Sequence, residues 1–294
     1  MFERFDEFDV LAEETLIHGR RGGDGPPLLL LHGFPQTHLM WHATAPRLAE
    51  HFTVVAADLR GYGSSGTPPS TPDHQPYSKR AMAHDMIEVM RKLGYDRFSV
   101  AGHDRGGRCA YRMALDHPSS VVRLAVLDLI PTNETFNRAD MRFALGYWPW
   151  SLLAQPHPFP ERLIAGAPDM IVTYPLDTWS SDPARFPDTV RREYLRQFRD
   201  PNHVHAICEE FRAAATVDYS QDETDKGTCQ IRCPVLSIWS KRGPVEAWYD
   251  PLQIWKQWAA DVSGRGIDCG HFLPEEAPEE TAEELIAFFL NRPK

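Results

Sequence analysis

An aspartate occupies the centre of a motif that hydrolases use to present a nucleophile. Gly102, Asp104 and Gly106 follow a short apolar segment in the spacing Gly-x-Asp-x-Gly, whereas esterases carry Ser at the central position. Small flanking residues let the strand and the helix approach each other, and the turn holds its central residue in a strained conformation. The motif therefore predicts Asp104 as a nucleophile, and a plain glycine-rich turn is the alternative.

A histidine and a second acid would complete a catalytic triad with Asp104. His271 lies after a predicted final strand, which matches the chain order nucleophile, acid, histidine of such hydrolases. Two carboxylates compete for the acid position. Asp128 ends the strand that follows the motif, and Glu246 lies beyond the predicted strand 235–239. We favour Asp128, and Glu246 remains the alternative.

Two backbone N–H groups are placed to stabilise an oxyanion. Phe34 follows the first apolar run of the predicted core, two residues after His32. Arg105 directly follows the predicted nucleophile, a position whose N–H serves this purpose in hydrolases with this turn. We expect the N–H groups of Phe34 and Arg105 to form the oxyanion hole.

The carboxylate nucleophile selects the class of reaction. Attack on an amide would give only an anhydride, whereas displacement of a leaving group from sp³ carbon gives a stable alkyl ester. His271, oriented by Asp128, would then activate water for attack on the carboxyl carbon of Asp104. Alkyl halides, halo acids and epoxides are the substrates that this chemistry predicts.

Two arginines indicate that the substrate is an anion. Arg105 and Arg108 stand three residues apart on the first turn of a predicted helix, so they share one face. Guanidinium groups at a helix N-terminus suit a carboxylate. We expect both to bind the substrate carboxylate, and the alternative is that one of them pairs with an acidic side chain. Arg112, a turn further on, is interpreted as structural.

Alternating strand-like and helix-like segments would position these residues. Short apolar runs without alternation read as strands buried on both faces. They cover 27–31, 53–57, 97–101, 124–130 and 235–239, and helical patterns cover 78–94 and 105–117. This order predicts an α/β fold with a mostly parallel central sheet flanked by helices. Such sheets bind ligands at the carboxyl ends of their strands.

A helical insertion interrupts the predicted core. Residues 132–222 are rich in aromatic residues, Arg and Pro and contain no strand-like run. We therefore predict a core made of residues 1–131 and 223–294, with residues 132–222 as an inserted helical cap. The insertion begins directly after a strand end, so we expect it to roof the site.

Composition and charge exclude several classes of partner. The chain has 31 Lys and Arg against 41 Asp and Glu, a net charge of −10, which disfavours nucleic acid. No apolar run approaches the roughly 20 residues of a membrane span, and we see no signal-peptide pattern. Five scattered cysteines fit reduced thiols, and Cys229 and Cys233 have no second ligand pair nearby. We expect a cytoplasmic protein with no membrane partner, no metal and no cofactor.

In these motifs the chain resembles the haloacetate dehalogenases, the family that includes fluoroacetate dehalogenase, within the α/β-hydrolase superfamily. The most specific match is the segment Asp-Arg-Gly-Gly-Arg at 104–108, because haloalkane dehalogenases and epoxide hydrolases usually have Trp directly after the Asp. The resemblance runs through nearly the whole chain, including 32–36 (HGFPQ), 58–63 (DLRGYG), 127–131 (LDLIP), 147–150 (YWPW), 153–156 (LAQP), 211–213 (FRA) and 270–275 (GHFLPE). It implies an α/β-hydrolase fold, Asp128 as the acid, a small anionic halo acid as substrate, and a homodimer.

One departure from this resemblance concerns the halide. Fluoroacetate dehalogenases hold fluoride with a His–Trp pair and a cap Tyr, and the matching positions here are Pro149, Trp150 and Thr216. Trp150 and Thr216 can donate hydrogen bonds, but Pro149 cannot. Because fluoride is the poorest leaving group of the halides, the lost donor disfavours C–F cleavage most, and we expect chloro-, bromo- and iodoacetate as substrates. For Trp150 the alternative is aromatic packing within the cap.

Two other functions stay open. An epoxide hydrolase of the same fold would need cap tyrosines that donate to the epoxide oxygen, and Tyr147, Tyr174 and Tyr194 are the candidates. A non-catalytic relative would bind a small carboxylate as a receptor or carrier, which the complete predicted triad disfavours.

Overall fold

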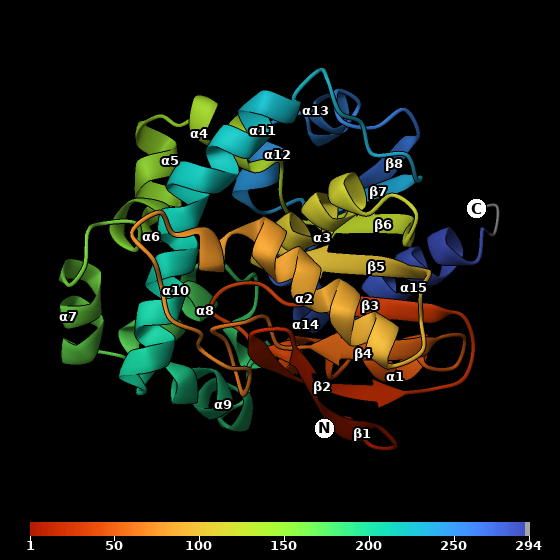
Figure 1. Cartoon of the computed structure of the whole chain (residues 1–294), viewed down its shortest axis with the longest axis horizontal. Helices are drawn as coiled ribbons and strands as arrows, with labels where there is room; N and C mark the ends of the chain where they lie inside the picture. The colour runs from red at the N-terminus through yellow and green to blue at the C-terminus, as the bar shows by residue number, and fades with distance from the viewer. Residues whose placement is uncertain (292–294) are drawn as a thin grey trace.

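The computed structural model describes residues 1–291, and an eight-stranded sheet lies at its centre (Figure 1). The strands are β1 (Asp6–Ala12), β2 (Thr15–Gly22), β3 (Pro27–Leu31), β4 (Thr53–Ala57), β5 (Phe98–His103), β6 (Val121–Leu127), β7 (Val235–Ser240) and β8 (Val262–Ile267). Across the sheet they run in the order β1-β2-β4-β3-β5-β6-β7-β8. β2 pairs antiparallel with β1 and β4, and the remaining neighbours pair parallel. The predicted α/β fold with a mostly parallel sheet is confirmed.

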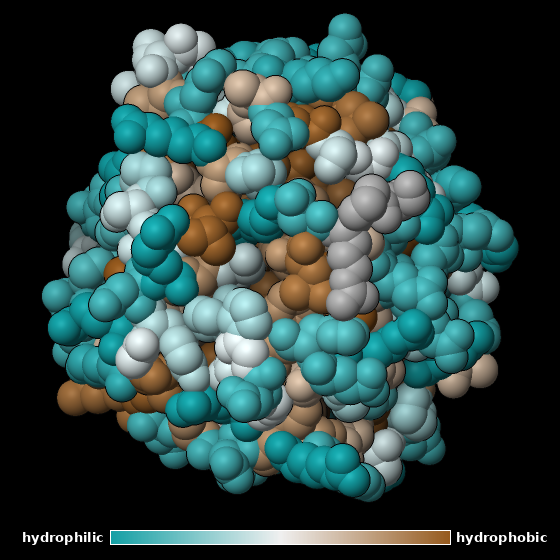
Figure 2. Space-filling model, turned by 90° about the vertical axis from the view of Figure 1, so that its right-hand side faces the viewer, coloured by the Kyte–Doolittle hydropathy of each residue, from teal (hydrophilic) through white to brown (hydrophobic). Residues whose placement is uncertain are grey.

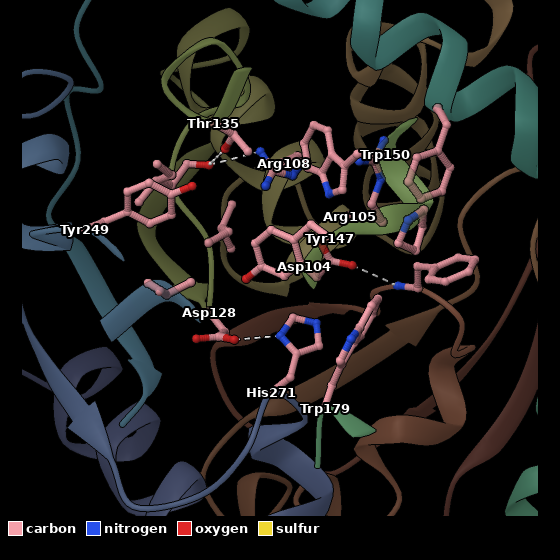
Figure 3. A pocket seen from close by; sticks show the side chains of 16 residues that line it. Asp104, Arg105, Arg108, Asp128, Thr135, Tyr147, Trp150, Trp179, Tyr249 and His271 are labelled. Atoms are coloured by element: carbon pink, nitrogen blue, oxygen red, sulfur yellow. Dashed lines mark hydrogen bonds and ion pairs between the residues drawn. The ribbon is translucent and has the colours of Figure 1, made fainter. Parts of the chain in front are cut away.

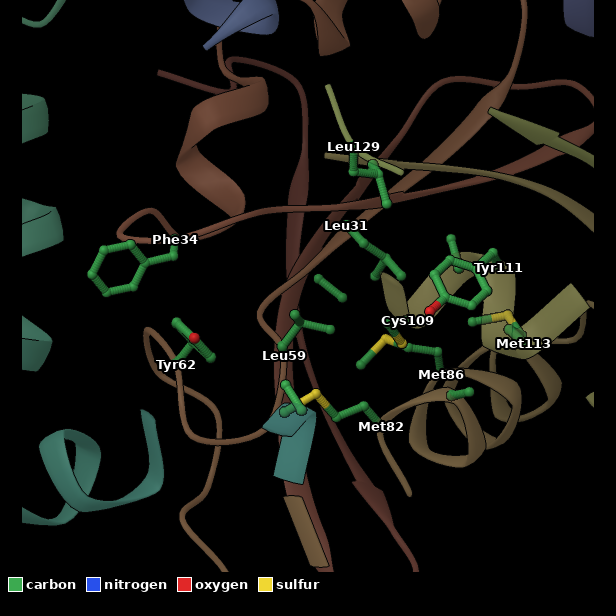
Figure 4. Packing of buried hydrophobic residues seen from close by; sticks show 14 of the residues in the cluster. Leu31, Phe34, Leu59, Tyr62, Met82, Met86, Cys109, Tyr111, Met113 and Leu129 are labelled. Atoms are coloured by element: carbon green, nitrogen blue, oxygen red, sulfur yellow. The ribbon is translucent and has the colours of Figure 1, made fainter. Parts of the chain in front are cut away.

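Helices of the first and last parts of the chain cover the two faces of the sheet. They are α1 (Ala45–Leu48), α2 (Lys79–Lys92), α3 (Asp104–Asp116), α12 (Pro244–Trp248), α13 (Pro251–Trp255), α14 (Leu273–Glu276) and α15 (Pro278–Phe289). On one face, Met86 of α2 and Cys109 of α3 belong to the same buried cluster as Leu31 (Figure 4). On the other, Leu48 of α1 and Leu285 of α15 share a second buried cluster. Apolar contact on both faces explains the continuous apolar runs of the central strands.

The segment between β6 and β7 is helical, apart from an isolated β-bridge at Ile231. Its helices are α4 (Thr132–Asn137), α5 (Met141–Gly146), α6 (Trp148–Leu152), α7 (Phe159–Gly166), α8 (Met170–Thr178), α9 (Asp188–Phe198), α10 (Pro201–Ala213) and α11 (Tyr219–Asp225), with a 3₁₀ turn η3 (Pro183–Arg185) and a π-helical turn η4 (Ala214–Asp218). Figure 1 shows most of these helices grouped at one side of the sheet. We call the group of helices α4 to α11 the cap. The predicted cap boundaries, residues 132 and 222, remain predictions.

Local sequence explains where several cap helices begin. Asp140 accepts a hydrogen bond from the Phe143 N–H (3.0 Å) at the start of α5. Asp200 does the same for the Asn202 N–H (2.9 Å) at the start of α10. Such caps satisfy backbone donors that have no partner inside the helix. Pro149 stands in the first turn of α6, where its missing N–H removes no helical hydrogen bond.

The surface away from the cap is mainly hydrophilic. Figure 2 shows this face with hydrophilic side chains around smaller apolar areas. The most exposed large apolar side chains lie instead on the cap, where Met141 and Leu145 of α5 are 76% and 73% exposed. Among the helices of residues 1–291, none is long and apolar enough to cross a membrane.

Candidate active site

Asp104 stands at a sharp turn between β5 and α3, as the first residue of the helix. Its φ of +43° lies in the left-handed region, which is strained for a residue with a side chain. Both motif glycines are needed for this turn: a Cβ on Gly102 would lie 2.4 Å from the Gly106 carbonyl oxygen, and one on Gly106 would lie 2.4 Å from that of His32. The strain at Asp104 is therefore held by close backbone contacts on both sides.

His271 pairs with Asp128. The Nδ1 of His271 lies 2.6 Å from Oδ2 of Asp128, and both side chains are buried. The other oxygen of Asp128 accepts a hydrogen bond from the backbone N–H of Ser240 at 2.9 Å. Glu246, the alternative acid, is exposed and accepts a hydrogen bond from the Trp239 indole. The structure thus brings Asp128, and not Glu246, to the histidine.

The N–H of Phe34 points at the predicted nucleophile. It donates to Oδ2 of Asp104 at 3.1 Å. His32 helps to hold this loop, because its ring accepts a hydrogen bond from the Leu59 N–H at 3.0 Å. The Arg105 N–H belongs to the first turn of α3, where backbone donors have no partner within the helix. The Phe34 N–H thus contacts the carboxyl group of Asp104, and the role of both N–H groups as an oxyanion hole stays a prediction.

Charged neighbours control the ionisation of this group of residues. Removal from bulk water acts to raise the pKa of Asp104, but His271, Arg105 and Arg108 together hold that pKa below its ordinary value. Burial acts to lower the pKa of His271, but its hydrogen bond and charge interaction with Asp128 raise it above the ordinary value. Burial also raises the pKa of Asp128, against the effect of His271. The arrangement favours an ionised Asp104, as a nucleophile requires.

A small pocket joins these residues to the cap (Figure 3). It is lined by Phe34, Asp104, Arg105, Arg108, Asp128, Leu129, Ile130, Thr135, Tyr147, Pro149, Trp150, Trp179, Phe211, Val245, Tyr249 and His271. The cavity has a volume of about 20 Å³. A single water needs about 10–15 Å³, so the cavity has room for one or two waters and its ligand must be small.

Arg105 faces the pocket with only part of its guanidinium group. Its Nε donates to both carboxylate oxygens of Glu210, at 2.8 and 2.9 Å, and its Nη2 also bonds to Glu210. Its Nη1 is buried and has no partner among the described residues. The alternative, in which one arginine pairs with an acidic side chain, therefore applies to one edge of Arg105, and the binding of substrate by both arginines stays a prediction. The other nitrogen remains available to a ligand.

Arg108 is held by the strand end beside it. Its Nη1 donates to the carbonyl oxygen of Ile130 at 3.0 Å and to the hydroxyl of Thr132 at 3.3 Å. Its Nε is buried and has no partner within residues 1–291. The Trp150 ring lies against both arginines, with its centroid 4.3 Å from the Cζ of Arg108 and 4.8 Å from that of Arg105. Arg112, by contrast, pairs with acids outside the pocket.

Thr216 does not reach the pocket, and this corrects the prediction that it binds substrate. Its side chain is exposed, and its hydroxyl donates to the Arg212 carbonyl oxygen at 2.7 Å. The residue that faces the pocket is Phe211, whose ring centroid lies 4.1 Å from the Cζ of Arg105. Thr216 lies in the π-helical turn η4 that follows α10, so its direction does not follow the α-helical repeat from Phe211.

Sequence reasoning also missed part of the aromatic wall. Tyr249 lines the pocket although it lies beyond the cap, after β7. Of the three tyrosines considered for an epoxide, only Tyr147 lines the pocket. Tyr174 is 46% exposed on α8, and Tyr194 donates to Glu275 at 2.8 Å. Nothing local in the sequence marks Tyr249, because its position depends on how the loop after β7 folds back.

Two clusters outside the pocket have ligand atoms close enough for a metal ion. One contains His18, His38 and Asp58; the other contains His157, Glu161 and His205. In the first, Asp58 already accepts from the His38 ring at 2.8 Å. In the second, the Arg212 guanidinium occupies the carboxylate of Glu161 at 2.8 Å. Neither cluster touches the pocket, so neither can take part in chemistry at Asp104.

Several known proteins with similar sequences and structures are described as hydrolases. A family profile described as alpha/beta hydrolase fold matches residues 26–278. The chain is 44% identical over 289 residues to a fluoroacetate dehalogenase of Burkholderia sp, which covers 98% of this chain and 95% of that protein. It is 32% identical to a soluble epoxide hydrolase of Corynebacterium sp. (strain C12), over 96% of this chain and 98% of that one. Among solved structures, ALR0039 of Nostoc sp PCC 7120, described as an α/β hydrolase, matches with a TM-score of 0.96 and 49% identity, over 98% of this chain and 99% of that one.

Proposed function

Because the chain belongs to the α/β-hydrolase superfamily, and within it to the family of fluoroacetate dehalogenase, we propose that this hydrolase removes halide from small 2-halo carboxylates. The observation that carries the proposal is the content of one small pocket. It combines a carboxylate nucleophile, Asp104, with unpartnered guanidinium nitrogens of Arg105 and Arg108. A nucleophile for saturated carbon and a receptor for an anion together select a halo acid over a neutral halide.

The first step forms an ester between enzyme and substrate. The substrate carboxylate binds to Nη1 of Arg105 and to Arg108, which presents C2 to Asp104. A carboxylate oxygen of Asp104 attacks C2, and the carbon–halogen bond breaks as the halide leaves with the bonding electrons. The product is an alkyl ester of Asp104 and a free halide ion.

The second step hydrolyses that ester. Nδ1 of His271 is held by Asp128, so Nε2 is the nitrogen that accepts a proton from water. The resulting hydroxide attacks the carboxyl carbon of Asp104, and the N–H groups of Phe34 and Arg105 stabilise the oxyanion. Collapse of this tetrahedral intermediate breaks the ester C–O bond, and His271 returns the proton to the departing alkoxide. Haloacetate has then become glycolate.

The lining of the pocket supports chloride, bromide and iodide as leaving groups over fluoride. Trp150 offers an indole N–H, whereas Pro149 and Phe211 offer no donor to a halide. Loss of one well-placed donor costs about 10²–10³ in rate. We therefore infer that chloro-, bromo- and iodoacetate are favoured and that defluorination is slow.

A panel of haloacetates tests this function. Purified enzyme is incubated with fluoro-, chloro-, bromo- and iodoacetate, and released halide is measured by ion chromatography. We expect release from the last three and none from an Asp104→Asn variant, whose amide cannot act as the nucleophile. Absence of halide release by the wild type from every 2-halo acid would overturn the proposal.

An epoxide hydrolase is the second candidate, supported by one feature of the pocket. Tyr147 and Tyr249 both line it, and a tyrosine hydroxyl can donate to an epoxide oxygen. A relative with 32% identity is a soluble epoxide hydrolase. Turnover of styrene oxide together with no halide release would select this function over the first.

We also propose that the protein acts as a homodimer in the cytoplasm. Most of the large exposed apolar side chains of the described residues lie on cap helices, although Met1, Leu11 and Leu16 lie outside the cap. Those on the cap are Met141 and Leu145 on α5, Phe159 and Leu163 on α7, and Met170 and Tyr174 on α8. Exposed apolar groups of this kind favour association. All five cysteines are free thiols, which supports a reducing compartment. Light scattering coupled to size-exclusion chromatography tests the dimer.

A further inference from the structure

A buried ionic network lies behind the pocket and joins the cap to the core. Glu210, on cap helix α10, is fully buried, and its carboxylate receives Arg105 of α3. It also forms an ion pair with Lys79 of α2, and the Tyr62 hydroxyl donates to it at 3.2 Å. Lys79 is 1% exposed. One cap carboxylate therefore contacts two buried basic side chains from two different core helices.

The geometry of Arg105 depends on this carboxylate. A guanidinium group is planar and rigid, so fixing one edge fixes the direction of the remaining nitrogen. Glu210 binds Nε and Nη2, and Nη1 is the buried nitrogen left without a partner. Aromatic rings of Phe211 and Trp150 lie 4.1 and 4.8 Å from Cζ, which restricts the group further. Arg105 thus has one orientation available, and that orientation leaves Nη1 for the pocket.

Lys79 lies against the same carboxylate. Burial and the nearby charge of Arg105 lower the pKa of Lys79 well below its ordinary value, so Lys79 is not counted as a source of positive charge for the pocket.

We propose that Glu210 is a positioning residue for substrate recognition, which holds Arg105 from the cap so that Nη1 meets the substrate carboxylate. The inference rests on the proposed function, since it assigns the anion-binding site to the halo acid. It adds a requirement on the cap: the anion-binding site is complete only when α10 is seated on α2 and α3.

Binding of glycolate, the product anion, tests the inference without requiring turnover. Affinity is measured by calorimetry for the wild type, Glu210→Gln and Glu209→Gln, with the melting temperature of each. Glu209 is a matched control, because it neighbours Glu210 on α10, is buried and pairs with Arg212 and His74 away from the pocket. We expect Glu210→Gln to raise the Kd for glycolate on the order of tenfold to a hundredfold, as for loss of a charge-assisted contact. Glu209→Gln should leave it within about twofold.

Equal Kd values for the two glutamine variants would overturn the inference, since both remove one buried negative charge from the same helix. Should Glu210→Gln not fold, the double variant Lys79→Met/Glu210→Gln, which removes the carboxylate together with its amine neighbour, carries the same test, and a Kd unchanged from the wild type would overturn it. A wild type that binds glycolate but releases no halide would overturn the proposed function alone.

Discussion

At the scale of single residues, the site depends on pairs that control charge. Asp104 has positive neighbours that keep its pKa low, and His271 has Asp128, which keeps its pKa high. The two steps of the proposed reaction use these opposite shifts. The nucleophile must be anionic to attack C2, and the base must be neutral to accept a proton from water. Each requirement gives a separate prediction.

Removing the base should stop the reaction halfway. A His271→Ala variant retains Asp104 and both arginines, so alkylation proceeds and the ester accumulates. We expect one equivalent of halide per active site, followed by arrest. Mass spectrometry of the digested protein should find a carboxymethyl group on the peptide that contains Asp104. An unmodified peptide would exclude the covalent intermediate, and Asp104→Asn serves as the unreactive control.

The two steps should respond differently to pH. Since the pKa of His271 is raised above 6.5, the neutral base is lost as the pH falls, and kcat should fall with it. The pKa of Asp104 lies below its ordinary 3.8, so its alkylation should not change over the same range. Steady-state turnover and the single-turnover halide burst, measured between about pH 5 and 9, separate the two. A burst rate that fell in parallel with kcat would contradict this assignment.

At the scale of elements, the strand-to-helix turn and helix α10 together build the pocket. The turn presents Asp104, Arg105 and, one turn later, Arg108. Helix α10 supplies the opposite wall of the pocket with two consecutive residues. Glu210 accepts hydrogen bonds from Arg105, and the ring of Phe211 packs against the guanidinium group of Arg105. Neither element would make the proposed anion site alone. The turn lacks the partner that orients its arginine, and the cap helix lacks the cations.

The glycines of the turn should tolerate no side chain. A Cβ at Gly106 would lie 2.4 Å from the His32 carbonyl oxygen, which is backbone and cannot move aside. We expect Gly106→Ala to lower the free energy of unfolding by about 1–3 kcal/mol and to reduce kcat by displacing Asp104. Gly166→Ala is the control, because no atom lies within 4 Å of its Cβ. Urea unfolding checks both variants, and equal stabilities would contradict the close contact.

At the scale of the whole molecule, polar contacts fasten the cap to the core at several places around the pocket. Tyr194 of α9 donates to Glu275 of the core, and Gln197 donates to the Pro35 carbonyl oxygen at 2.8 Å. The overall charge of −10 does not oppose an anionic substrate, since nearby arginines outweigh distant charges that salt screens. An acidic protein can therefore hold a small acid in a local positive pocket.

Glu275 should make the stability of the protein depend on pH. Burial raises its pKa to about 8, whereas its ordinary value is 4.5. Between these values the unfolded state binds fewer protons, so the free energy of unfolding falls as the pH rises. Glu275→Gln removes this effect, and the unpartnered Oε1 of Gln36 can accept from the new amide. Urea unfolding at several pH values should give a flatter profile for this variant.

The control for this measurement is Glu283→Gln, which alters an exposed carboxylate paired with Arg47. It should keep the pH dependence of the wild type. If the free energy of unfolding of Glu275→Gln depends on pH as strongly as those of the wild type and Glu283→Gln, then Glu275 is ionised in the folded protein.

The sequence alone was sufficient wherever the deciding interaction is local in the chain. Apolar runs without alternation indicated the parallel strands, because a strand covered on both faces has no polar side. The spacing of Gly102, Asp104 and Gly106 indicated the turn, because close backbone contact excludes other side chains there. The order of Asp104, Asp128 and His271 follows from the order of the strands that carry them. These predictions needed no knowledge of distant contacts.

Tertiary structure decided the contacts that join segments far apart in the chain. Glu210 lies 105 positions from the arginine it holds, and no pattern near either residue shows the pairing. The cap wall is Phe211 and not Thr216, because the direction of a helical side chain depends on how the helix is rotated against the core. That rotation is set by packing and buried charged groups across the interface between cap and core. A sequence motif carries no information about these contacts.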